Sequence, residues 1–241
     1  SSSGDFGAVY MASGTYSLTN RCYMYWDLLG DPSVDRASVQ ILSSGSVGFL
    51  RPIAGGSTSP NGPRTLSHFS ISSADLISTN ALIFTDTTTV LDDLIIDVQN
   101  TGAVAQFGLG MKGTIRNCSI TANVATAAAS GAILAYYADL DVIDSDIGPG
   151  YFHGGPILQG YGAYTLNIVN SHFHDLTSTI AAISSEGFGS GHAYMTNTII
   201  ERTSTLPASS PVIFSDVYFA VTNCTFRDNV AGTGVFTAYQ A

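Results

Sequence analysis

Acidic and imidazole side chains recur in the second half of the chain, where they could exchange protons with a substrate. Asp146 and His172 occupy matching places in successive segments, and His174 and Glu201 do the same two residues further on. A carboxylate beside an imidazole can act as a general acid–base pair. These four residues are the candidates for catalysis, although alternating charges along a protein surface are often no more than a solvated row.

His172 and His174 could also ligate a metal ion, since residues two apart on a strand face the same side. A zinc site takes four ligands, drawn from Cys, His and carboxylates. No cysteine and few carboxylates converge on these histidines in the sequence. No metal site and no cofactor are therefore predicted.

Tyrosines recur in the same half of the chain. Exposed rings can stack on sugars or on a partner protein, whereas buried rings pack against each other inside the molecule. Both interpretations stay open for the candidate binding residues Tyr136, Tyr137, Tyr161, Tyr164 and Tyr218.

A repeated six-residue sequence motif, the phrase, is predicted to position these side chains. Between residues 66 and 226 a six-residue pattern occurs seven times, at intervals of 24 to 27 residues. Each copy has an apolar residue, then Asn, Asp or His two places on, then a small or apolar residue, and finally Ile or Phe. Such a period indicates stacked repeats, and the alternation indicates strands. The sequence predicts an all-β parallel β-helix, or solenoid, with coils of about 24–27 residues.

The Asn, Asp or His of each phrase is predicted to be a bend, because these residues accept left-handed backbone geometry. Stacked about 4.8 Å apart, the bends form a side-chain ladder. The residue after each bend points inward, so Cys118 and Cys224 are predicted to be buried free thiols, too far apart to form a disulfide. The predicted ladder consists of Asn117, Asp144, Asn170, Asn197 and Asn223.

The amino-acid composition limits the classes of molecule that the protein is expected to bind. Eight basic residues face 18 acidic ones, a net charge of −10, which makes nucleic acid an improbable partner. The uncharged run 117–138 keeps the coil period, so no transmembrane segment is predicted. Low charge suits an extracellular or cell-surface protein. Residues 1–65 are predicted to form an irregular cap with the first imperfect coils, and 66–241 one continuous domain of regular coils.

Short motifs carry a resemblance to known repeats. Residues Phe226–Asn229 reproduce an FxxN element, and Ser130–Ile133 approximate GGA followed by Ile, Leu or Val. Both elements resemble the repeats of chlamydial polymorphic outer-membrane proteins, which are surface adhesins. Over residues 66–241 the chain resembles the wider pectate-lyase-like superfamily. That resemblance implies a right-handed β-helix with an asparagine ladder, and it makes a polysaccharide-active enzyme a serious candidate.

The resemblance also implies catalytic equipment that this sequence lacks. Lyases of this shape use calcium held by several aspartates and several basic residues, but Lys112 is the only lysine here. Related galacturonan hydrolases pair two aspartates with Gly-His-Gly and Arg-x-Lys elements. Asp92 and Asp93 are followed by no such elements at the expected spacing.

The sequence therefore predicts a non-catalytic extracellular module, structural or adhesive. Because the last strand runs to the end of the chain without a cap, such a module would be able to stack end to end in a filament. Its expected partners are other copies of itself or a longer parent chain, with cell-surface glycans or proteins as further candidates. Two alternatives stay open: a polysaccharide-active enzyme, lyase or hydrolase, acting through the Asp146/His172 face, and a carbohydrate-binding module acting through the tyrosines.

Overall fold

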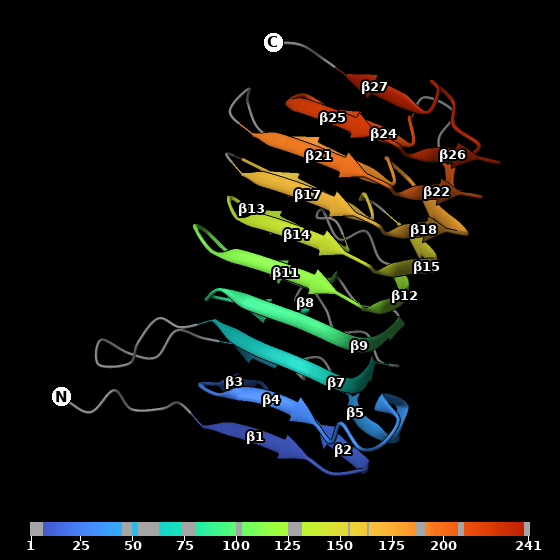
Figure 1. Cartoon of the computed structure of the whole chain (residues 1–241). Helices are drawn as coiled ribbons and strands as arrows, with labels where there is room; N and C mark the ends of the chain where they lie inside the picture. The colour runs from blue at the N-terminus through green and yellow to red at the C-terminus, as the bar shows by residue number, and fades with distance from the viewer. Residues whose placement is uncertain are drawn as a thin grey trace.

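The protein is a single parallel β-helix. A computed structural model describes residues 7–44, 50–52, 63–73, 81–99, 103–124, 132–153, 155–162, 164–186, 191–206 and 210–238. In Figure 1 the front strands run from left to right and the chain returns behind them while it climbs from the N-terminus to the C-terminus, so the coil is right-handed. The predicted all-β, right-handed solenoid is confirmed.

Two sheets wind around the core, one of 18 strands and one of nine, in the described part of the chain. Every strand pairing between the named strands is parallel, and strands in the middle coils pair with their counterparts one coil below and one coil above, as β17 does with β14 and β21. Before the bend, the 18-stranded sheet contains β1 (Ala8–Met11), β4 (Asp27–Gly30), β7 (Arg64–Ser73), β9 (Thr89–Gln99), β11 (Lys112–Arg116), β14 (Asp139–Ile143), β17 (Thr165–Val169), β21 (His192–Thr196) and β25 (Tyr218–Thr222).

After the bend, the same sheet continues, with β7 and β9 running through it. Its strands there are β2 (Gly14–Leu18), β5 (Val39–Ser43), β12 (Ser119–Val124), β15 (Asp146–Phe152), β18 (His172–His174), β19 (Leu176–Ser178), β22 (Ile199–Glu201), β23 (Ser204–Thr205) and β26 (Thr225–Arg227). The nine-stranded sheet consists of β3 (Cys22–Met24), β6 (Leu50–Pro52), β8 (Ala81–Thr85), β10 (Ala103–Phe107), β13 (Ile133–Tyr136), β16 (Leu158–Tyr161), β20 (Ile183–Glu186), β24 (Ile213–Ser215) and β27 (Phe236–Ala238).

The predicted bends are the bends of the fold. All seven have left-handed backbone geometry, with φ between 49° and 59°, at His68, Asp93, Asn117, Asp144, Asn170, Asn197 and Asn223. The amide ladder is continuous over the last three members: Asn197 Nδ2 donates to Asn170 Oδ1 at 3.2 Å, and Asn223 Nδ2 donates to Asn197 Oδ1 at 2.6 Å. Asn117 donates instead to Asp92.

The core is built from vertical columns, as the phrase predicts. Ile147 pairs with Ile120 below it and with Phe173 above it, and all three are buried. The column after the bend is linked by hydrogen bonds, since the backbone N–H of each residue donates to the hydroxyl one coil above. This column comprises Cys118, Ser145, Ser171 and Thr198.

All three cysteines are free. Cys118 is buried as predicted, and burial raises the pKa of its thiol to about 12. The prediction that Cys224 is buried is wrong, because this residue is only partly covered. It precedes β26, on which no further strand stacks in the described part of the chain.

Residues 1–65 contribute β1 to β6, which are paired in the same parallel manner as the later coils. Between β4 and β5 a short 3-10 helix, η1 (Arg36–Ser38), crosses the ladder. Its first residue, Arg36, donates to Asp93 Oδ1 at 2.7 Å and to the carbonyl of Asn117 at 2.9 Å. Within the described residues, no helix is long and apolar enough to cross a membrane.

Candidate functional site

The catalytic candidates meet on the outer face of β15 and β18. In each phrase the residue after the bend is inside, so the next residue points out. Asp146 and His172 are both such residues, and they are direct partners in the register of the two strands. The period alone therefore predicted this contact correctly.

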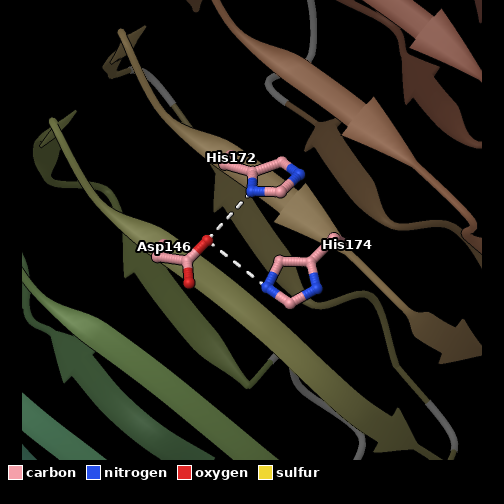
Figure 2. Close-up of side chains that lie close together, drawn as sticks. All are labelled: Asp146, His172 and His174. Carbon is pink, nitrogen blue, oxygen red and sulfur yellow. Dashed lines mark ion pairs between the residues drawn. The ribbon is translucent and has the colours of Figure 1, made fainter.

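The second histidine reaches the same carboxylate. Asp146 Oδ1 lies 3.1 Å from His172 Nδ1 and 3.3 Å from His174 Nε2, as Figure 2 shows. The two imidazole rings stack with their centroids 4.5 Å apart at an interplanar angle of 25°. Asp146 is 52% exposed and His172 is 36% exposed, whereas His174 is 15% exposed. One carboxylate oxygen thus faces two ring nitrogens at the surface.

A glycine lets the strand of Asp146 approach His174. The pairing of β12 with β15 shifts register between Ile120 and Ala122, which gives β15 one extra residue at this point. Gly148 has φ of +140°, and a Cβ built there would lie 1.9 Å from the carbonyl oxygen of His174. Only glycine tolerates this approach.

Two further groups hold His174 in place. Its Nδ1 lies 2.8 Å from Asp175 Oδ2 in a hydrogen bond. Arg202 donates two hydrogen bonds to the same carboxylate, from Nε to Oδ1 at 2.6 Å and from Nη2 to Oδ2 at 2.9 Å. The bond from Arg202, supported by His174, holds the pKa of Asp175 well below its usual range. The sequence analysis missed Asp175, although its position one coil before Arg202 was a signal.

Glu201 is a buried, ionised carboxylate rather than an exposed one. It is 3% exposed, because Arg202 and Arg227 lie against it and both donate to it. The hydrogen bond from Arg227, helped by Arg202, lowers the pKa of Glu201 to about 2 against the opposing effect of burial. Its Oε1 lies 3.3 Å from His172 Nε2. Glu201 therefore orients His172 and is screened from any substrate.

The exposed members of this group can do two kinds of chemistry. Asp146 and either imidazole are close enough to exchange a proton. One ligand atom from each of Asp146, His172 and His174 also lies within 4.8 Å of the other two, the spacing of a metal-binding group. The sequence analysis expected no metal site because too few carboxylates converge there. Asp146 is one carboxylate that reaches both histidines, and the expectation that no metal binds stays a prediction.

The other acidic pair has structural partners. Asp92 Oδ2 accepts from Arg116 at 2.8 Å. Asp93, at a ladder bend, pairs with Arg36 at 2.7 Å and with His68 at 2.5 Å. Both carboxylates are thus held in ion pairs within the protein.

The structure divides the candidate tyrosines among three places. Tyr136 and Tyr161 stack face to face at 5.5 Å with Tyr137 against their edges, at the ends of β13 and β16. Tyr164 lies in the core, where its hydroxyl bonds Ser185 Oγ. Tyr218 is 63% exposed on β25, in the other sheet. The tyrosines therefore do not form a single row.

The chain was compared with known proteins. No family model matches it, and no curated protein is significantly similar to it in sequence. The narrower resemblance to chlamydial surface repeats therefore stays a prediction. Several solved structures are similar in fold.

One such structure is the catalytic domain of GH87 alpha-1,3-glucanase in complex with nigerose, with 10% identity and a TM-score of 0.40; the match covers 97% of this chain and 64% of the glucanase domain. An alginate lyase from Paenibacillus sp. str. FPU-7 has 12% identity and a TM-score of 0.30, over 93% of this chain and 92% of the lyase. A protein of Geobacillus virus E2 has 12% identity and a TM-score of 0.21, over 98% and 54%. The chain thus spans less than two thirds of the glucanase domain.

These matches bear on two predictions. The prediction of a parallel β-helix is confirmed by the strand pairing, and the resemblance to the pectate-lyase-like superfamily stays a prediction. The prediction of a non-catalytic structural or adhesive module is corrected, because the matched glucanase and alginate lyase are polysaccharide-degrading enzymes. The sequence argument had excluded only enzymes that need many basic residues for an acidic polymer. At this identity and TM-score the matches show a similar fold alone.

Proposed function

We propose that this chain is a polysaccharide-active enzyme whose site is the outer face around Asp146, His172 and His174. The single observation that carries the proposal is the shared carboxylate: one Asp146 oxygen lies within 3.3 Å of two stacked imidazoles. A carboxylate and an imidazole at this distance can donate and accept the proton that cleavage of a glycosidic bond requires.

Each group has a distinct role in this proposal. Asp146 is the most exposed member and reaches the substrate, whereas His172 exchanges protons with it. His174 packs against His172 and fixes the second side of the carboxylate. Glu201, paired with two arginines, is a positioning residue for His172.

The proposed substrate is an extended, uncharged polysaccharide. The parallel strands present a long outer face, which suits a polymer. A net charge of −10 repels a polyanion, and Arg202 and Arg227 are occupied by carboxylates of the protein itself. Hydrolysis is therefore favoured over the elimination that uronate polymers undergo. An enzyme of this kind acts on polymers outside the cell, which is the proposed location.

A panel of neutral and acidic polysaccharides tests the proposal, with released reducing ends and unsaturated ends measured in parallel. Asp146→Asn and His172→Gln are each expected to lower the rate by about 10²–10⁴, the usual contribution of a general acid or base. Asp97→Asn is the matched control, since Asp97 is an exposed aspartate on the same sheet, where its carboxylate accepts a hydrogen bond from Gln99 at 2.9 Å. No cleavage of any polymer, or full activity in Asp146→Asn, would overturn the proposal.

A second candidate function is glycan binding at the tyrosine cluster. Tyr136 is 38% exposed, stacks on Tyr161, and also lines a pocket with Phe84 and Leu109. Aromatic faces of this kind stack on sugar rings. Binding at this place predicts that Tyr136→Ala weakens retention on an immobilised glycan while Asp146→Asn does not.

A further inference from the structure

The histidine pair has more carboxylate neighbours than neutral imidazoles can satisfy. His172 has Asp146 at one ring nitrogen and Glu201 at the other, at 3.1 and 3.3 Å. His174 has Asp146 and Asp175 in the same way, at 3.3 and 2.8 Å. A neutral imidazole carries one proton on its two nitrogens. Four nitrogens thus face carboxylate oxygens with only two protons between them.

Hydrogen bonding assigns one of those two protons. The bond from His174 Nδ1 to Asp175 places a proton on Nδ1 and leaves Nε2 unprotonated, 3.3 Å from Asp146 Oδ1. His172 Nε2 is covered from solvent and faces the ionised Glu201, without a well-directed hydrogen bond. With its proton on Nε2, toward Glu201, His172 likewise has an unprotonated Nδ1, 3.1 Å from Asp146 Oδ1. Two unprotonated ring nitrogens then lie beside one carboxylate oxygen.

The two unprotonated nitrogens beside Asp146 can be satisfied in two ways. Two extra protons would make two imidazolium rings whose centroids are only 4.5 Å apart. One divalent cation would supply both charges at a single position and accept all three lone pairs. We infer that Asp146, His172 and His174 bind one divalent transition-metal ion of the zinc class.

The distances fit this ion. Zinc binds imidazole nitrogen and carboxylate oxygen at about 2.0–2.2 Å, so neighbouring ligand atoms of a tetrahedral site lie roughly 3.4 Å apart. The two distances from Asp146 Oδ1 to the ring nitrogens are 3.1 and 3.3 Å, and all three ligand atoms lie within 4.8 Å of one another. Two imidazoles with one carboxylate are a ligand set that zinc and ferrous sites use, with a position left open for water or a substrate oxygen.

The groups behind the ligands are those that metal sites use. A metal-bound histidine almost always donates its other N–H to a carboxylate or carbonyl, which fixes the ring and its tautomer. Asp175 does this for His174, and Arg202 in turn holds Asp175. Glu201 faces the far nitrogen of His172 and is held by Arg227. Each supporting carboxylate is paired with an arginine. The negative charge of Asp146 is therefore the one that remains to balance the charge of the ion.

Titration calorimetry of the full chain, stripped with chelator, with zinc chloride as the probe tests the inference. The wild type is expected to bind one Zn²⁺ per chain. Asp146→Asn, His172→Ala and His174→Ala are each expected to weaken binding at least tenfold. His192→Ala, which removes another exposed histidine of the same sheet, is the matched control and is expected to bind like the wild type. Circular dichroism in chelator confirms that each variant is folded.

The result that overturns the inference is a wild type that binds no Zn²⁺, or binding that all three ligand variants leave unchanged. The ion site stands independently of the proposed function, and the two fail in different ways. Zinc binding through the triad without cleavage of any polysaccharide would remove only the function. Cleavage by a chain that binds no Zn²⁺ would remove only the ion.

Discussion

His68 and the pair His172–His174 solve the same electrostatic problem in different surroundings. His68 lies at a ladder bend with the Val34 carbonyl 2.8 Å from Nε2 and Asp93 2.5 Å from Nδ1. Both of its ring nitrogens face acceptors, as do both nitrogens of His172 and His174. The difference is that His68 stands alone, whereas the other two rings stack and share one carboxylate.

For the single ring of His68, one added proton is sufficient, because both ring nitrogens can then donate to their acceptors. The hydrogen bond to Val34, and then that to Asp93, raise the pKa of His68. Arg36 shares Asp93 and completes its compensation. For the stacked pair, two protons would place like charges face to face, so one divalent ion is the better solution. The comparison teaches that the number of rings per carboxylate, rather than the presence of histidine, separates a structural bend from a site.

Zinc should therefore stabilise the site of His172 and His174 and leave the bend at His68 unaffected. At a free Zn²⁺ concentration 100-fold above the dissociation constant, the free energy of unfolding of the wild type should rise by about 2.7 kcal/mol. His68→Asn should gain the same increment, because its own site binds no ion, whereas His172→Ala should gain none. Urea unfolding with and without zinc measures this. An equal gain in His172→Ala would place the ion elsewhere.

The sequence predicted those features of the two histidine regions that follow from the repeated motif and the inward–outward alternation along each strand. The phrase specified the bends at His68 and Asn170, and the coil period placed Asp146 beside His172. Residue type and spacing alone decide these features, because backbone geometry and strand pairing repeat from coil to coil.

The remaining features depend on contacts that no local pattern contains. His174 meets Asp146 where β15 carries one extra residue at Gly148. Glu201 was expected on the outside and is buried, because Arg202 and Arg227 fold over it. Long side chains from neighbouring coils determine such burial. The alternation of inward and outward residues along one strand does not predict it.

Removing the carboxylate behind His174 should give the next largest effect. Asp175→Asn keeps the shape of the side chain but loses the charge that fixes the tautomer of His174. Zinc affinity should fall by about 10–100-fold, or about 1.4–2.7 kcal/mol, as it does when such supporting groups are changed in metal sites. Calorimetry measures the change directly.

The matched control for this variant is Asp228→Asn. Asp228 has the same left-handed bend geometry two coils above Asp175, with φ of 54° against 51°. Asp228 acts on the neighbouring Arg227 only through its charge, and the structure gives it no ion pair with either histidine, so zinc affinity should stay near the wild-type value. Equal losses in both variants would mean that net charge, rather than the orientation of His174, controls binding.

The smallest effect expected is a change in how stability depends on pH at His68. Because the pKa of His68 is higher in the folded state than its ordinary value of 6.5, the folded protein holds this proton more tightly than the unfolded chain does. The stabilisation is complete below about 6.5 and is lost as pH rises through the folded-state pKa. His68→Asn keeps a residue that tolerates the bend but removes the proton, so this part of the slope should disappear. Urea unfolding in chelator from about pH 5 to 8 measures it, and His192→Asn, which leaves the bend intact, should retain the slope. An unchanged slope in His68→Asn would mean that the acceptors at Val34 and Asp93 do not hold an extra proton, and the contrast between one ring and two would lose its basis.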